Sequence, residues 1–191
     1  MLEGSGELRG VVTLEAVNGV ATFTGLNIDL VGADKRLFAE AEGLASDSTA
    51  TFTITPAPAA LFTKYVGDQQ VTQAGTAVDF APSVRVEDIF GNPIPGVSVS
   101  FAVTSGGGSI LPTTAVVTNA DGIASLTSWT LGTTVGQNTL TASTAGFSTL
   151  TFSALGSEDL KATITTSGNW TVPPGVTEIT VEGWGAGGAG G

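Results

Sequence analysis

The 191-residue chain contains no cysteine and no histidine, and it has only six basic residues against seventeen acidic ones. Without cysteine, a disulfide framework and thiolate metal sites are excluded. Without histidine, the chain lacks the commonest general base and the commonest zinc ligand, and Ser-His-Asp catalysis is excluded. The formal net charge of −11 would repel phosphate groups, so we expect no binding to nucleic acids or to anionic membranes.

Long apolar runs are also missing. The most apolar windows, such as 11–14 and 97–103, are short and typical of strands, so we expect no segment to insert into a membrane. The first residues lack the basic and apolar regions of a signal peptide. Hydrophobic residues still make up 41% of the chain, Val and Thr are frequent, and no window keeps a 3.6-residue period. These features predict a folded all-β protein with almost no helix.

The strongest feature is an internal repeat of about one hundred residues. The segment Asn18–Phe23 resembles Asp121–Leu126, and both contain a hairpin-forming Asn-Gly or Asp-Gly pair at an offset of 103. Further matched pairs are Leu37 with Leu140, Ala39 with Ala142, Gly43 with Gly146, Leu44 with Phe147 and, at an offset of 100, Phe52 with Phe152. Such a constant register predicts two related folding units.

Alternating residues predict the strands of both copies. We expect strands at 20–25, 37–41 and 49–55 in the first copy, and at 123–128, 139–143 and 149–154 in the second, with Phe52 and Phe152 as core anchors. The second copy has additional predicted strands at 60–66, 77–87, 97–104 and 115–119, a breaker-rich turn at 88–96 and a flexible glycine loop at 105–109. Candidate core residues there are Phe80, Val84, Val86, Val97, Val99, Phe101 and Val103. About seven short strands predict a Greek-key sandwich.

This order of motifs resembles the bacterial Ig-like domains of the invasin and intimin type. The resemblance rests on the stretch Val86–Phe101, the glycines Gly106–Gly108 and the turn Thr118–Ala124, and it covers roughly Ala57 to Leu155. It implies a rigid repeat that holds a binding tip away from the cell and carries no catalytic residue. The first copy, Gly4 to Thr55, resembles the second half of a related repeat. We therefore expect either that Met1 is not the natural start of a complete protein or that another chain supplies the missing strands.

The last segment has a different character. Thr166–Val181 predicts two strands around a Pro-Pro-Gly turn and leads into the glycine-rich stretch 183–191. It resembles the opening of glycine-rich domains in phage tail fibres and bacterial surface proteins. The predicted fold is all-β: immunoglobulin-like Greek-key β-sandwich repeats, one complete and one partial, plus a partial Gly-rich β module. The predicted domains are 1–56, 57–156 and 157–191, joined by linkers at 56–58 and 156–159.

Four groups of residues are candidates for functional sites, and none is assigned a catalytic, cofactor-binding or metal-binding role. Gly106–Gly108 lack the helix and the Lys-Ser/Thr pair of a phosphate loop. Calcium needs six to eight converging oxygens, whereas the candidate aspartates are scattered along the sequence: Asp34, Asp47, Asp68, Asp79, Asp88 and Asp121. Glu87 and Asp88 are the least unfavourable calcium ligands. Glu40 and Glu42 are predicted to lie on one strand face, as are Glu158 and Leu160 near a linker. Both pairs lack the surroundings of a glycosidase site. Trp129 is expected either in the core or as a plug at the end of the domain, and Trp170 and Trp184 either stack on sugars or pack within the glycine-rich module.

The functional hypothesis is a non-catalytic structural spacer of an extracellular, adhesin-like surface protein, without a cofactor. Its expected partners are neighbouring Ig-like domains of the same polypeptide and a host or cell-surface glycan or protein. The alternatives are a phage tail-fibre or glycan-binding module, and accessory repeats of a larger secreted enzyme. The expected location is outside the cell, on the cell surface or on a virion tail.

Overall fold

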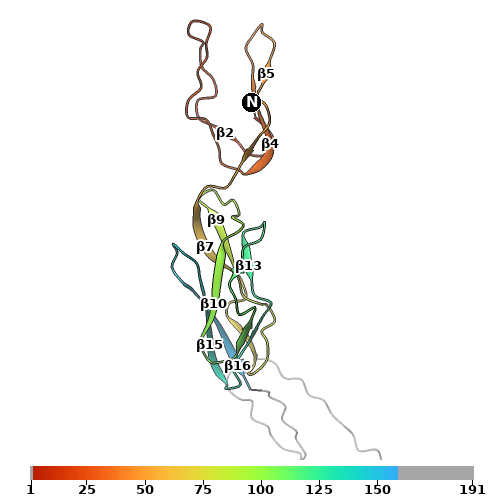
Figure 1. The fold of residues 1–191 in the computed structure, drawn as a ribbon, viewed down its shortest axis with the longest axis vertical. Helices are drawn as coiled ribbons and strands as arrows, with labels where there is room; N and C mark the ends of the chain where they lie inside the picture. The colour runs from red at the N-terminus through yellow and green to blue at the C-terminus, as the bar shows by residue number, and fades with distance from the viewer. Residues whose placement is uncertain (1, 159–191) are drawn as a thin grey trace, which may run out of the picture. The chain divides into compact units, whose positions relative to one another are not determined.

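The structure is a computed structural model that describes residues 2–158, and these residues form only strands and their connections (Figure 1). Helix is absent from this part of the chain, which confirms the prediction from the missing helical periodicity. None of the described residues therefore forms a helix long and apolar enough to cross a membrane. The glycine-rich module predicted for 157–191 lies outside the described residues, apart from Ser157 and Glu158.

Ten strands form a sandwich in the central part of the chain. They are β7 (Ala59–Val66), β8 (Gln70–Gln73), β9 (Ser83–Asp88), β10 (Ser98–Ser105), β11 (Ser109–Leu111), β12 (Val116–Val117), β13 (Ile123–Ser125), β14 (Ser128–Thr130), β15 (Gly136–Ser143) and β16 (Leu150–Ser157). One sheet has the order β12-β10-β15-β16-β8, in which only β8 and β16 run parallel. The other main sheet has the order β13-β9-β7, and β11 pairs with β14. This is the all-β, immunoglobulin-like sandwich that the sequence predicts.

The two main sheets enclose one hydrophobic core, because alternate residues of their strands point inward. In β15 the buried residues are every second one, Asn138, Leu140 and Ala142. Trp129 of β14 is fully buried in the same core, as predicted. Of the other predicted core residues, those that are buried or packed against the core are Val84, Val86, Val97, Val99, Phe101, Val103 and Phe152.

Phe80 is a predicted core residue that the structure places at the surface, where it is 65% exposed. The Gln70 side-chain amide accepts a hydrogen bond from the Phe80 N–H at 2.8 Å and donates one to the Phe80 carbonyl at 2.8 Å. These bonds replace strand pairing at Phe80, so β9 begins only at Ser83 and the strand predicted at 77–87 is too long. The prediction is wrong because alternation along the sequence does not show this contact between residues ten positions apart.

The residues of the loop 105–109, predicted to be flexible, are all exposed, but two of its glycines lie very close to neighbouring atoms. At Gly108, where φ is +85°, an added Cβ would lie 2.1 Å from the carbonyl oxygen of Thr130. At Gly106 an added Cβ would lie 2.4 Å from Oδ1 of Asn138, which is fully buried. Positions 106 and 108 are therefore glycine because no side chain fits there, which gives these two glycines a packing role.

The first copy contains six short strands. They are β1 (Leu2–Glu3), β2 (Leu8–Arg9), β3 (Asn27–Ile28), β4 (Gly32–Ala39), β5 (Asp47–Ser48) and β6 (Phe52–Ile54). β4 pairs with β1, β5 and β6, and β2 pairs with β3. The predicted Asn18-Gly19 hairpin is confirmed, since Val17 and Val20 exchange backbone hydrogen bonds of 2.9 and 3.0 Å and both turn residues have positive φ.

The strand predicted at 20–25 is wrong, because only Val20 takes part in a bridge and residues 21–24 have no regular pairing. In the second copy the equivalent strand β13 pairs with β9. No described strand of the first copy takes the place of β9, so residues 21–24 lack the partner that fixes β13. Phe52, expected as a core anchor, is only half-buried, whereas Phe152 is fully buried.

The two predicted linkers differ in the structure. Residues 56–58 connect β6 to β7, as predicted. The linker predicted at 156–159 begins inside β16, which ends at Ser157, and the Ser157 carbonyl accepts a hydrogen bond from Ala74 N at 2.8 Å. That prediction is wrong for its first two residues. The domain boundaries at 56 and 156 stay predictions.

Candidate functional site

The most highly connected polar side chains lie where the β6–β7 connection meets the turn after β9. We define the joint as the side chains of Asp88 and Asn92 with the backbone that they bind, at Ala57 and at residues 29–31. Asp88 is the last residue of β9, and Asn92 follows it in the turn; their exposed fractions are 0% and 1%. Buried polar groups of this kind cost stability unless their hydrogen bonds are made.

All hydrogen bonds to the Asp88 carboxylate come from neutral N–H groups. Oδ1 accepts from Phe90 N at 2.8 Å and Asn92 N at 2.9 Å. Oδ2 accepts from Ala57 N at 3.0 Å and from Asn92 Nδ2 at 2.8 Å. The carboxylate therefore fixes both the turn that follows it and the connection from β6.

The environment of Asp88 changes its acidity. Burial alone would raise the pKa of Asp88, but the hydrogen bonds from the side chain and backbone of Asn92, from Ala57 and from Phe90 outweigh burial and hold this pKa below its usual value. The carboxylate is consequently charged at neutral pH without a basic partner among the described residues.

Asn92 extends the network into the first copy of the repeat. Its Nδ2 donates to the Asp29 carbonyl at 2.6 Å, and its Oδ1 accepts from Val31 N at 3.1 Å. One amide side chain thus pairs with the backbone on both sides of Leu30, as a neighbouring strand would. The Asp29 carboxylate pairs with Arg9 at 3.0 Å, which links this backbone to β2.

The joint ties two parts of the chain together and presents no free group for chemistry. The carboxylate that the sequence offered as the least unfavourable calcium ligand has both oxygens occupied by N–H donors. Glu87, the other candidate, pairs with Arg85 at 3.2 Å. The structure therefore gives these two residues roles in hydrogen bonding and ion pairing, and Asn92 was not singled out from the sequence.

The remaining aspartates are not brought together. Asp34, Asp47, Asp79 and Asp121 are exposed, and within residues 2–158 there is no group of three or more metal-ligating side chains. Asp68 pairs with Lys64 and accepts hydrogen bonds from Ser153 N at 2.8 Å and Gln69 N at 3.0 Å. Burial raises the pKa of Asp68, but these contacts, led by that of Lys64, lower it overall.

The carboxylates considered for glycoside hydrolysis are Glu40, Glu42 and Glu158. β4 ends at Ala39, so Glu40 and Glu42 are exposed residues of a connection, and the prediction that they share a strand face is wrong. Glu158 is exposed, and its predicted neighbour Leu160 lies outside the described residues.

The remaining candidates from the sequence are the three tryptophans and the glycines of the loop 105–109. The Nε1 atom of Trp129 is buried without a hydrogen-bond partner among the described residues, so the indole ring is held by packing in the core. Trp170 and Trp184 lie outside the described residues. Gly106–Gly108 lie between β10 and β11, so they open no helix and form no phosphate loop.

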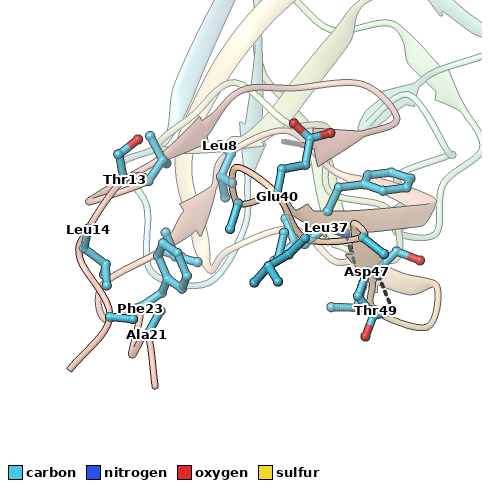
Figure 2. Close-up of a pocket in the computed structure, with 18 residues that line it drawn as sticks. Leu8, Thr13, Leu14, Ala21, Phe23, Leu37, Glu40, Asp47 and Thr49 are labelled. Carbon is cyan, nitrogen blue, oxygen red and sulfur yellow. Dashed lines mark hydrogen bonds between the residues drawn. The ribbon is translucent and has the colours of Figure 1, made fainter. Parts of the chain in front are cut away.

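A second feature is an open apolar groove in the first copy, with a volume of about 810 Å³ (Figure 2). In Figure 2, Phe23 and Leu14 lie on one side of the groove and Leu37 lies on the other. Phe23 is 41% exposed and Leu44, also in the lining, is 74% exposed. Exposed apolar side chains that gather in this way mark a surface that a partner can cover.

No protein-family model and no curated protein sequence matches the chain. Among solved structures, the D00-D0 domain of intimin matches with 18% identity, over 80% of this chain and 78% of that chain, at a TM-score of 0.42. FdeC, described as an Escherichia coli adhesin, matches with 15% identity over 83% of this chain at a TM-score of 0.49. The Yersinia pseudotuberculosis adhesin InvE matches with 20% identity over 79% of this chain at a TM-score of 0.41. The matches span only 50% of the FdeC chain and 46% of the InvE chain. The structural neighbours of this chain are thus Ig-like domains of bacterial adhesins of the intimin and invasin type.

Proposed function

We propose that the chain is a non-catalytic spacer segment of a bacterial surface adhesin, in which successive Ig-like repeats hold a binding domain away from the cell. The observation that carries the proposal is the joint. Buried Asp88 and Asn92 bind the connection at Ala57 and the first copy at residues 29–31, so adjoining repeats are coupled by specific hydrogen bonds.

A spacer needs joints that resist bending, because a flexible joint shortens the average reach of the array. The prolines Pro56 and Pro58 restrict the backbone of the connection, and Asp88 binds the N–H of Ala57 between them. Three successive residues of the connection are therefore limited either by ring geometry or by a buried hydrogen bond.

The sequence adds support for a location at the cell surface. The order of turn, strand and glycine loop resembles Ig-like repeats of invasin and intimin, and the net charge of −11 favours solubility of a Val- and Thr-rich β protein. The partners in this proposal are neighbouring Ig-like domains, and a host or cell-surface molecule contacted by the domain that the spacer carries. In the glycan-binding alternative, loops or the glycine-rich part would contact glycans; Trp170 and Trp184, the candidate stacking residues, lie outside the described residues.

Surface display tests the proposal. The chain is displayed on bacteria without adhesins of their own, alone or with a binding module of known affinity at its tip, and adherence to receptor-coated surfaces under a polymer layer is counted. We expect no adherence by the chain alone and stronger adherence when the module is carried by the chain than when it lies directly at the cell surface. Adherence by the chain alone, or binding of the isolated chain on a glycan array, would contradict the spacer role.

A further inference from the structure

The opening and closing strands of the complete copy run side by side in the same direction. β8 pairs with β16 in parallel, from Gln70 opposite Ala154 to Gln73 opposite Ser157. All other strand pairs in the described part of the chain are antiparallel. The exception joins the part of the copy that follows the connection 56–58 to the strand at which the copy ends.

Contacts on both sides of β8 continue this alignment. Three contacts precede β8: Phe62 with Phe147 at 5.8 Å between ring centroids, Lys64 with Phe152 at 5.4 Å from Nζ to the ring centroid, and Asp68 with Ser153 at 2.8 Å from Oδ1 to N. After β8, the Ala74 N–H donates to the Ser157 carbonyl at 2.8 Å. Because the residue numbers rise together in both partners, the stretch 62–74 follows the stretch 147–157 in one direction.

Tension along the polypeptide enters this copy at the connection 56–58 and leaves it after Ser157. The ribbon shows β7 beginning next to the connection and β16 ending at the far end of the sandwich (Figure 1). Pulling at these two points drives the stretches 62–74 and 147–157 in opposite directions along their common axis. The hydrogen bonds between β8 and β16 are then loaded together, in shear, because every pair must shift at once.

The direction of pulling decides how many bonds resist. Two strands that are pulled apart from the same end separate pair by pair, and each bond breaks alone. Strands in shear must lose several bonds at the same moment, which raises the barrier to unfolding. Forced unfolding is governed by the unfolding rate and hence by this barrier.

We propose that the contact between residues 62–74 and 147–157 is a tension-bearing clamp that keeps the complete copy folded when the polypeptide is stretched. Tension that arrives at Ser157 meets two kinds of hydrogen bond. The Ser157 carbonyl accepts from the Ala74 backbone, and its Oγ donates to the Thr72 carbonyl at 3.2 Å. The biological use of the clamp rests on the proposed spacer function, whereas the clamp itself is a property of the fold and is tested on the chain alone.

Ala74→Pro removes one bond of the clamp in a turn that accepts proline. Ala74 is the second residue of a turn that is closed by a hydrogen bond from Thr76 N to the Gln73 carbonyl at 3.1 Å. The third residue, Gly75, has a φ of +81°. This is the pattern of a type II turn, in which proline is favoured at the second position. Since proline has no N–H, the bond to Ser157 is lost.

The matched control is Ala120→Pro, outside the clamp. Ala120 is exposed and is also the second residue of a turn, closed by a hydrogen bond from Gly122 N to the Asn119 carbonyl at 3.0 Å. Both variants therefore place proline at the same position of a turn. They differ in whether the replaced N–H belongs to the clamp.

Single-molecule tweezers measure the lifetime of the folded copy at constant force. Since the chain has no cysteine, a handle can be attached at Ala145→Cys, an exposed position in the connection between β15 and β16. The full chain with this substitution is pulled either from its two ends or from its N-terminus and position 145. In the second geometry both stretches of the clamp are pulled from the same end. Unfolding of the complete copy is recognised by the length it releases, on the order of 30 nm for about a hundred residues.

The lifetime should be at least about tenfold longer when the chain is pulled from its two ends, a difference of about 1.4 kcal/mol in the barrier. Ala74→Pro should shorten this end-to-end lifetime by about tenfold, because a hydrogen bond in shear is lost and the proline ring occupies its place. It should leave the lifetime in the second geometry nearly unchanged, since there the pair at Ser157 breaks last. Ala120→Pro should change neither lifetime.

Equal lifetimes of the wild-type clamp in the two geometries would overturn the proposal, and this comparison does not depend on the stability of any proline variant. Equal shortening of both lifetimes by Ala74→Pro would also overturn it, because the bond would then add to general stability and not to resistance along one direction. Neither result decides the spacer function, which the adherence of displayed chains tests separately.

Discussion

The substitution Asp88→Asn gives the sharpest test of the joint, because it keeps the size of the side chain and removes its charge. Each carboxylate oxygen accepts two N–H groups: Oδ1 from Phe90 and Asn92, and Oδ2 from Ala57 and the Asn92 side chain. Whichever way the new amide turns, its NH₂ group faces two N–H donors. Two charge-assisted hydrogen bonds are therefore lost, each worth about 1.5–3 kcal/mol.

The expected loss at pH 7 is about 3–6 kcal/mol in the free energy of unfolding, a large part of the 5–15 kcal/mol that is typical of native proteins. Urea denaturation followed by circular dichroism measures this loss. The matched control is Asp121→Asn, an exposed position in the turn between β12 and β13, where Asn is accepted as readily as Asp. We expect the control to change stability by no more than about 0.5 kcal/mol.

The pH dependence gives an independent check. The pKa of Asp88 is lowered in the folded state, so the stability from this group is fully present above its ordinary value of 3.8. It is lost as pH falls from there through the lowered folded-state pKa. The difference between wild type and Asp88→Asn should therefore narrow below about pH 3.8. A loss at pH 7 no larger than that of Asp121→Asn would refute the reasoning.

Three further variants test other parts of the fold. Gly108→Ala should lower the free energy of unfolding by clearly more than the about 1–2 kcal/mol expected for a left-handed backbone alone, because its Cβ would lie 2.1 Å from Thr130 O. The control is Gly146→Ala, which is also at positive φ but has open space around its Cβ. In the same urea assay it should show only the cost of the left-handed backbone. Trp129→Ala should lower the free energy of unfolding by about 3–5 kcal/mol, measured by urea denaturation, because a fully buried ring is removed. Asp68→Asn should destabilise at pH 7 and lose its effect as pH falls below 3.8, because the folded-state pKa is lowered; an effect that grows at low pH would contradict this assignment.

Local patterns predicted the complete sandwich well, because its strands are regular and its core residues alternate. Val99 and Phe101 are buried where alternation placed them, and the Asn18-Gly19 hairpin forms where its residues favour positive φ. Phe80 was misplaced because a side-chain amide ten residues away holds its backbone. The strand at 20–25 was misplaced because a strand needs a partner, and alternation alone says nothing about whether the partner is present.

The joint was only partly visible in the sequence. Asp88 and the glycine and prolines after it predicted a turn, since Asp side chains bind N–H groups of the next residues. Asn92 is separated from Asp29 by sixty-three positions, so no local signal indicated their contact. An Asn followed by Pro at the end of such a turn is the one signal that could have drawn attention to it.

The most direct test of the joint is ¹⁵N relaxation of backbone amides in the full chain and in Asn92→Ala. In wild type we expect the amides of β4 and β9 to report one common rotational diffusion, because Asn92 binds both sides of Leu30. In Asn92→Ala the β4 amides should tumble faster than those of β9. Independent tumbling of β4 and β9 in the wild-type chain would contradict the account.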